Sequence, residues 1–230
     1  MFFLVLITFL LQIDCVWSSK NFPTRAPVGP ERYEFLTGKL SVGNDLKSRW
    51  DRFYGKSQFM YGKKPAKFLA ANYHVIPPHG KVLDIGMGEG RNGVFLATKG
   101  RQVTGIDISE VAVKKAELLA KEYGTKIKSI VADVEKYDFP PHSFDAIISF
   151  YYVDRKLLSR LMKWLKPGGY IFYEAHLIDY KRRLKSKEPD QYFLKKRELL
   201  EFFPKFKVLK YSESASDQDM ASSIVVKKTL

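Results

Sequence analysis

Cysteine is almost absent from this sequence: Cys15 is the only one among 230 residues. A single thiol excludes an intramolecular disulfide and any zinc site built from several cysteines. The chain also lacks a run of ~20 apolar residues, which is the length that a membrane-spanning helix needs. Internal repeats and low-complexity tracts are missing as well, so a solenoid or a fibrous protein is excluded.

The overall composition is that of a globular protein. Hydrophobic residues make up 45% and charged residues 28%, a balance that excludes wholesale disorder. A chain of 230 residues is long enough for one domain with a full core. The net charge is +14, from 39 Lys and Arg against 25 Asp and Glu. This excess favours a polyanion, an anionic membrane surface or an anionic small substrate as partner, without choosing among them.

The first residues form a segment of their own. Residues 2–11 are apolar except for Thr8, and residues 16–18 offer small side chains at plausible cleavage positions, although no Lys or Arg precedes the run. Such a length is typical of the apolar part of a secretory signal. We predict that residues 1–19 are a signal or an uncleaved anchor, which would place the protein outside the cytoplasm or at a membrane.

Two alternatives for this segment stay open. Residues 1–19 could be a start codon assigned too early or a cap helix, in which case a cytoplasmic location is expected. A lipoprotein with Cys15 as its modified residue is the other alternative, but Asp14 stands where a small residue is expected. Residues 20–45 are rich in Pro and Gly without a sustained period, which predicts a linker or arm. The compact domain is predicted to cover residues 46–230.

Apolar runs and helical periods alternate through that domain. The predicted helices cover residues 92–99, 110–123 (capped by Ser109), 155–165 and 194–203. The predicted strands cover residues 81–86, 102–107, 126–131, 144–149, 169–175, 206–212 and 222–228. The alternation of strands and helices predicts an α/β fold, a Rossmann-like doubly wound sheet of seven strands that is mostly parallel. The last two strands have no helix between them and predict an antiparallel hairpin at one edge.

A glycine loop follows the first predicted strand. Gly86, Gly88 and Gly90 allow the backbone to turn tightly and to approach a ligand closely. Asp107 ends the second strand, where a carboxylate can accept hydrogen bonds from both hydroxyls of a ribose. The alternative is a plain strand-to-helix turn, with Asp107 as a helix cap beside Ser109.

These features resemble a known family. The segments VLDIGMGEG (82–90), VTGID (103–107), VADV (131–134), FDAIISF (144–150) and LKPGG (165–169) are similar to the ordered motifs of class I S-adenosylmethionine-dependent methyltransferases. A looser resemblance, to the small-molecule group of tellurite-resistance and thiopurine methyltransferases, rests on WDRFY (50–54), YGKKP (61–65) and DQYFLKKRE (190–198). Met87 stands where Cys is common in this motif.

The resemblance implies S-adenosylmethionine as cofactor and a set of residues that hold it. Gly86, Gly88 and Gly90 would surround its methionine part, Asp107 would hold the ribose, and Asp133 would bind the adenine amine. The complete implied set is Asp84, Gly86, Gly88, Gly90, Asp107, Ile108, Asp133, Val134, Ser149, Phe150 and Tyr61. The alternatives are a turn or cap residue for Asp133 and an ordinary packing residue for Phe150.

Methyl transfer from a sulfonium is an in-line displacement that requires alignment and exclusion of water, so no metal site is expected. A general base is needed only when the acceptor arrives protonated. His176 and Tyr151 are the candidates for that role, with Tyr152 and Glu174 as further options at strand ends.

The predicted function is methyl transfer to a small molecule, with a thiol or a metalloid oxyanion as possible acceptors. The basic run at residues 181–187 suits an anionic substrate or an RNA backbone, or else it is a solvated loop. A nucleic acid is the less favoured partner because aromatic side chains for base stacking are few in this run. Membrane contact is expected only through the N-terminal segment. The alternatives are an RNA or protein methyltransferase and a nucleoside-binding protein without turnover.

Overall fold

The structure is a computed structural model that describes residues 45–186, 189–214 and 220–229. The predictions for the N-terminal segment and for residues 20–44 lie outside these described residues. No helix within them is long and apolar enough to cross a membrane.

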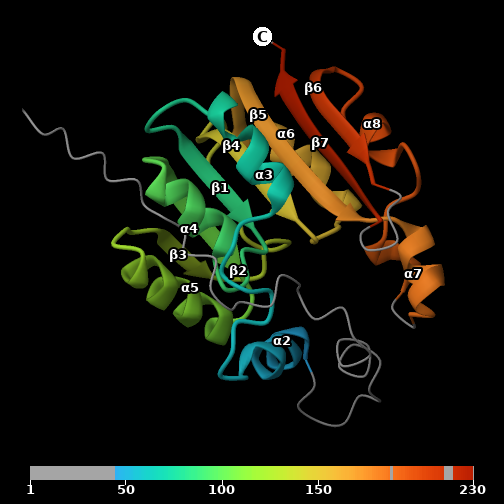
Figure 1. The fold of residues 1–230 in the computed structure, drawn as a ribbon. Helices are drawn as coiled ribbons and strands as arrows, with labels where there is room; N and C mark the ends of the chain where they lie inside the picture. The colour runs from blue at the N-terminus through green and yellow to red at the C-terminus, as the bar shows by residue number, and fades with distance from the viewer. Residues whose placement is uncertain (1–44, 187–188, 215–219, 230) are drawn as a thin grey trace, which may run out of the picture.

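The described residues form one seven-stranded sheet in the order β3-β2-β1-β4-β5-β7-β6 (Figure 1). Its strands are β1 (Lys81–Ile85), β2 (Gln102–Asp107), β3 (Lys128–Val131), β4 (Phe144–Phe150), β5 (Leu165–His176), β6 (Phe206–Glu213) and β7 (Ala221–Lys228). The first five strands pair in parallel, whereas β7 is antiparallel to both β5 and β6. The predicted fold class, with its antiparallel C-terminal hairpin, is therefore confirmed.

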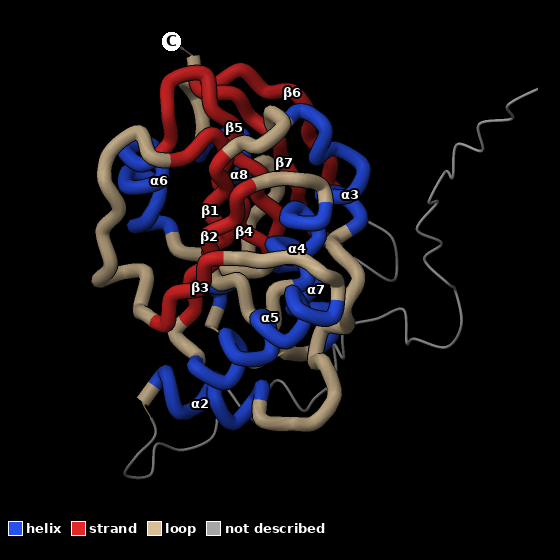
Figure 2. The backbone as a smooth tube through the Cα atoms, turned by 90° about the vertical axis from the view of Figure 1, so that its left-hand side faces the viewer, coloured by secondary structure: helices blue, strands red, loops and turns tan. Residues whose placement is uncertain are grey.

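Helices cover both faces of the sheet (Figure 2). The helices are α2 (Leu46–Tyr54), α3 (Lys67–Asn72), α4 (Arg91–Thr98), α5 (Glu110–Glu122), α6 (Leu158–Trp164), α7 (Ile178–Leu184) and α8 (Glu198–Phe202). Buried side chains of α3 and α4 pack on one face of the sheet, and those of α6 and α8 pack on the other. Leu83 and Val82 are fully buried and point to opposite faces, which is why β1 reads as a continuous apolar run.

The connection from α6 to β5 differs from the prediction. The predicted helix 155–165 is a 3₁₀ turn at Arg155–Leu157 followed by α6, and β5 begins at Leu165 rather than at 169. Pro167 therefore lies inside a strand. The pairing of β4 with β5 is irregular between Phe144 and Ala146, and this bulge lets the sheet accept the Pro-Gly-Gly sequence.

The region after β5 also differs from the prediction. A solvated loop is one of the two interpretations of the basic run 181–187, but residues 181–184 belong to α7. The predicted helix 194–203 is shortened to α8, because Leu194 is extended and bridges Leu177. The short helix α3, between α2 and β1, was not predicted at all. Each difference arises where contacts distant in sequence decide the local conformation.

Candidate functional site

A cavity of about 420 Å³ opens where the parallel strands β1, β2 and β4 end. Open α/β sheets bind ligands at this edge. The cavity is lined by the loop after β1, the ends of β2 and β4, residues after β3, and helix α2. Its lining includes Trp50, Tyr54, Tyr61, Gly62, Asp84, Gly86, Met87, Gly88, Glu89, Arg91, Asp107, Ile108, Asp133, Val134, Glu135, Phe150, Tyr151, Tyr152, Asp154, Arg155, Lys156, Gln191 and Tyr192.

The glycine loop has a backbone that other residues rarely adopt. The φ angles of Gly86, Gly88 and Gly90 are 60°, 53° and 83°. A Cβ atom on Gly86 would lie 3.1 Å from Cβ of Tyr152, which shows how closely this backbone approaches the cavity wall. Gly90 has a different role, since it precedes α4 and a Cβ atom there would lie 2.6 Å from Cβ of Ala116.

Asp107 ends β2 beneath this loop and is 8% exposed. Its Oδ2 accepts a hydrogen bond from the Gly88 N–H at 2.8 Å, and its Oδ1 accepts one from the Ser109 N–H at 2.9 Å. Burial raises the pKa of Asp107 to about 6. A carboxylate offers about four acceptor positions, so the group can still accept hydrogen bonds from a ligand in the cavity.

Asp84 lies deeper, near the end of β1, and is 2% exposed. Burial raises its pKa to about 8, and the nearby charge of Asp107 adds to the effect, while Arg91 opposes it. The folded protein therefore keeps a proton on Asp84 that the unfolded chain has released.

This shift predicts a pH dependence of stability. The contribution of Asp84 is greatest at low pH and is lost as the pH rises towards 8, because the folded state binds more protons there. Between pH 6.5 and 8, we expect wild-type stability to fall by about 1 kcal/mol per pH unit more than that of Asp84→Asn. Urea unfolding of both proteins across this range is the measurement. Parallel curves for the two proteins would show that Asp84 is ionised throughout.

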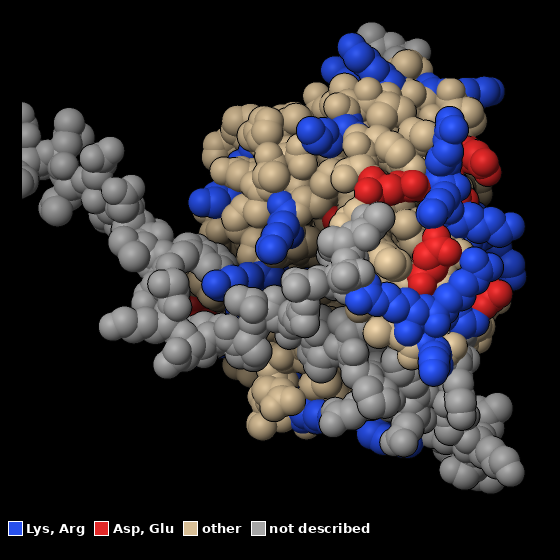
Figure 3. Space-filling model, turned by 45° about the vertical axis from the view of Figure 1, so that its right-hand side comes forward, with Lys and Arg blue, Asp and Glu red and all other residues tan. Residues whose placement is uncertain are grey.

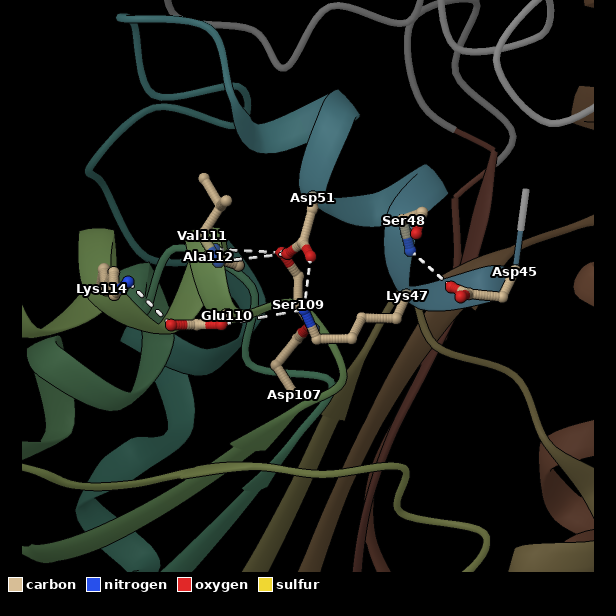
Figure 4. Close-up of polar contacts among 10 residues, drawn as sticks. All are labelled: Asp45, Lys47, Ser48, Asp51, Asp107, Ser109, Glu110, Val111, Ala112 and Lys114. Carbon is tan, nitrogen blue, oxygen red and sulfur yellow. Dashed lines mark hydrogen bonds and ion pairs between the residues drawn. The ribbon is translucent and has the colours of Figure 1, made fainter. Parts of the chain in front are cut away.

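Helix α2 and the segment that follows it form a cover over the cavity. Asp51 of α2 accepts hydrogen bonds from the Ser109 hydroxyl at 2.7 Å and from the Val111 N–H at 3.2 Å (Figure 4). The Ser109 hydroxyl also caps α5, as predicted, by accepting from the Ala112 N–H. The N-terminus of α5 thus fixes both Asp107 below the cavity and α2 above it.

A buried ion pair holds the rest of this cover. The Lys115 Nζ lies 2.5 Å from Glu89 Oε1, with the two side chains 13% and 3% exposed. Lys115 also donates to the carbonyl groups of Tyr54, Lys56 and Gln58. Oε2 of Glu89 accepts from the Met60 N–H at 2.6 Å. The segment 55–62 is therefore attached to the glycine loop and to α5, next to Tyr61 and Gly62 in the cavity wall.

The residues after β3 and at the end of β4 complete the wall. Asp133 lies in a turn, where its Oδ1 accepts from the Glu135 N–H at 3.0 Å, and it faces the cavity as well. The turn position of Asp133 is thus confirmed, and its binding of the adenine amine stays a prediction. Tyr151 follows β4 with a φ angle of 62°, which is rare for a residue other than glycine.

Comparison with known proteins identifies the domain. A family described as a methyltransferase domain matches residues 82–169. A ubiquinone biosynthesis O-methyltransferase from Vibrio cholerae is 30% identical over 141 residues, which are 57% of this chain and 56% of that protein. The chain thus spans little more than half the length of the curated relatives that it matches. Residues 82–169 thus match a methyltransferase domain, in agreement with the resemblance to class I S-adenosylmethionine-dependent methyltransferases.

Solved structures agree in fold. A methyltransferase of this type from Methanosarcina mazei superposes with a TM-score of 0.57 at 23% identity, covering 73% of this chain and 99% of that one. TehB from Haemophilus influenzae gives a TM-score of 0.59 at 18% identity, covering 80% of this chain and 67% of that one. At such identities these likenesses show the fold alone, so the looser resemblance to the tellurite-resistance and thiopurine group stays a prediction.

The methyltransferase cavity fits the cofactor of the family. The glycine backbone forms a cradle that a side chain at position 86 would narrow, and Asp107 keeps free acceptor capacity for ribose hydroxyls. Asp133 and Val134 face the same cavity on the β3 side. No group of three or more His, Cys, Asp and Glu side chains that could hold a metal ion occurs among the described residues.

Ten of the predicted site residues line the methyltransferase cavity, namely Tyr61, Asp84, Gly86, Gly88, Asp107, Ile108, Asp133, Val134, Phe150 and Tyr151. Three do not. Gly90 packs against α5, and the Ser149 hydroxyl donates to the Tyr152 carbonyl at 3.1 Å. The His176 ring lies beside Tyr151, 4.7 Å between ring centres, and stacks on Tyr180 at 4.3 Å.

Sequence reasoning missed Arg91, Glu89 and Asp154 as parts of the wall. Glu89 lies within the glycine motif, so the sequence shows its position there. The sequence does not show which residues its carboxylate contacts. Lys115 is one of several lysines of α5, and nothing in the local pattern distinguishes it.

Proposed function

We propose that this protein transfers the methyl group of S-adenosylmethionine to a small-molecule acceptor bound in the same cavity. The observation that carries the proposal is the covered cavity itself, in which a cofactor cradle and a further wall of Trp50, Tyr152 and Tyr192 face one space. A volume of about 420 Å³ suits the cofactor and part of a compact acceptor better than a folded macromolecule.

The bound cofactor supplies a methyl group on a positively charged sulfur. The protein's own residues supply alignment and exclusion of water. Asp107 and the glycine backbone orient the cofactor from below. Trp50, Tyr54 and Tyr61 close the cavity from above, and this apolar cover keeps water away from the transfer path.

Positive side chains occur both in the cavity wall, at Arg91, Arg155 and Lys156, and on the surface away from it. Lys and Arg gather on the right-hand side of the molecule in Figure 3, towards the region of α7. Several of these charges are paired: Arg182 and Lys196 with Asp179, and Lys181 with Asp190. None of the α7 residues lines the cavity. We therefore infer that the basic run takes no direct part in acceptor binding and is a poor RNA-binding surface.

The test uses the whole protein and cofactor with a labelled methyl group, offered to separated small-molecule, RNA and protein fractions of cells. We expect label in the small-molecule fraction and none in RNA at ~150 mM salt, where charges on a surface are screened beyond about 8 Å. Site-specific labelling of RNA or protein would replace the proposed acceptor class. Cofactor binding without transfer to any fraction would indicate a nucleoside-binding protein.

A further inference from the structure

Tyr151 occupies an unusual position in the cavity wall. It follows β4 with a φ angle of 62°, in a backbone region that side chains other than glycine rarely adopt. The Tyr151 N–H donates to the Glu174 carbonyl on β5 at 2.7 Å, and this bond holds the strained conformation. Strained residues of this kind gather at functional sites, and here the strain brings a phenol to the cavity.

The phenol hydroxyl is bound to a carboxylate of the sheet. It donates to Oε1 of Glu174 at 2.7 Å, while the Ser223 hydroxyl of β7 donates to Oε2 at 2.7 Å. Glu174 is 6% exposed and Ser223 is 7% exposed. The two bonds fix the carboxylate on both oxygens, with one side directed at the Tyr151 hydroxyl.

Burying a glutamate side chain within a sheet costs free energy of folding. Removing a carboxylate from water disfavours its charged form, and an apolar residue at this position of β5 would pack without that penalty. A phenylalanine in place of Tyr151 would fill the wall equally well. The pairing of a buried acid with the hydroxyl of a tyrosine in the cavity wall therefore points to proton transfer and not to packing.

We propose that the acceptor is a hydroxyl compound and that Tyr151 takes its proton during methyl transfer, with Glu174 and Ser223 as positioning residues. This inference rests on the proposed function. A hydroxyl such as a phenol, with a pKa of ~10, arrives protonated at neutral pH, whereas a thiol, at ~8.5, ionises more readily. The acceptor oxygen forms the new bond to the methyl carbon as the carbon–sulfur bond breaks and its electron pair stays on sulfur. The acceptor proton passes to the Tyr151 oxygen, and the proton of Tyr151 passes to Oε1 of Glu174.

The geometry also explains why His176 is not the base. Its ring packs against the ring of Tyr151 and stacks on Tyr180, and it is not part of the cavity wall. The Arg91 guanidinium lies over the Tyr151 ring, with its Cζ 5.6 Å from the ring centre. Its positive charge favours electron density on the phenol.

The test compares Tyr151→Phe and Glu174→Gln with wild type on two probe acceptors, catechol and thiophenol. Catechol arrives protonated and thiophenol arrives ionised at neutral pH. We expect kcat on catechol to fall about 10²- to 10⁴-fold in both variants, with KM little changed, since this is the usual contribution of a positioned acid or base. Transfer to thiophenol should change by less than about threefold. Cofactor affinity, measured by calorimetry, should stay within threefold of wild type.

The pH dependence of kcat and a control variant test the role of Glu174 further. The rise of kcat with pH on catechol should be lost in Glu174→Gln, because the amide cannot accept the proton. Tyr211→Phe is the matched control, since it removes a tyrosine–glutamate hydrogen bond of 2.6 Å to Glu213 on the edge strand β6 and should leave both reactions unchanged.

The outcomes separate the two proposals. Equal losses on catechol and thiophenol, or full activity of Tyr151→Phe on catechol, would overturn the role of Tyr151 and leave the transferase function intact. Wild-type protein that binds cofactor but methylates neither probe would overturn this inference alone, whereas wild-type protein that binds no cofactor would overturn the proposed function as well.

Discussion

Asp107→Ala is expected to weaken binding of S-adenosylmethionine by ~2–3 kcal/mol, which is the usual strength of hydrogen bonds to a charged group. The side chain lies under the glycine loop and retains acceptor positions towards the cavity. Its loss removes the bonds to the ribose and also frees the N–H of Gly88, so that the loop is less well ordered before binding. Calorimetry with the folded variant measures the change directly.

Asp145→Asn provides the control for Asp107. Asp145 is a carboxylate of the same sheet, but it lies at the opposite end of β4, where it binds Lys166 at 2.7 Å and the Lys81 N–H at 2.8 Å. It does not line the cavity, so we expect unchanged cofactor affinity. If Asp107→Ala keeps its fold and binds the cofactor as wild type does, Asp107 is not part of the ribose site.

The fold was predictable because its determinants are local. Apolar runs such as residues 82–85, glycines at the strand ends and the cap at Ser109 each act within a few residues, and the structure confirms all of them. Asp107 was predictable for the same reason: a carboxylate at the end of a parallel strand, next to a glycine loop, can only lie at the ligand-bearing edge.

The remaining features depend on contacts between distant parts of the chain. Leu194 is extended because Leu177 pairs with it, although its own sequence favours a helix. Glu174 and Tyr151 are 23 residues apart, and Glu174 and Ser223 are 49 apart, so no local pattern joins them. His176 was favoured as a base because it follows β5, but the packing of Tyr180 against its ring could not be read from the sequence.

The buried pair of Glu89 and Lys115 gives the largest expected effect on stability. Lys115→Ala is expected to lower the free energy of unfolding by about 3–5 kcal/mol, because Glu89 would be left buried without a cation. Burial already raises the pKa of Glu89 in spite of Lys115, which shows how costly its charge is at this place. The variant also frees the carbonyl groups of Tyr54, Lys56 and Gln58, so cofactor affinity should fall along with stability.

Urea unfolding and calorimetry test this coupling. They compare the single variants Glu89→Gln and Lys115→Met with the double variant that carries both changes. The double variant should lose less stability than the sum of the two single variants, because no uncompensated charge remains when both partners are replaced. Lys114→Ala is the matched control on the same helix: its pair with Glu110 spans 2.7 Å but is exposed to solvent, and its loss should leave stability close to that of wild type. Additive losses of stability in the double variant would show that Glu89 and Lys115 stabilise the cover independently. Unchanged cofactor affinity in Lys115→Ala would show that segment 55–62 takes no part in cofactor binding.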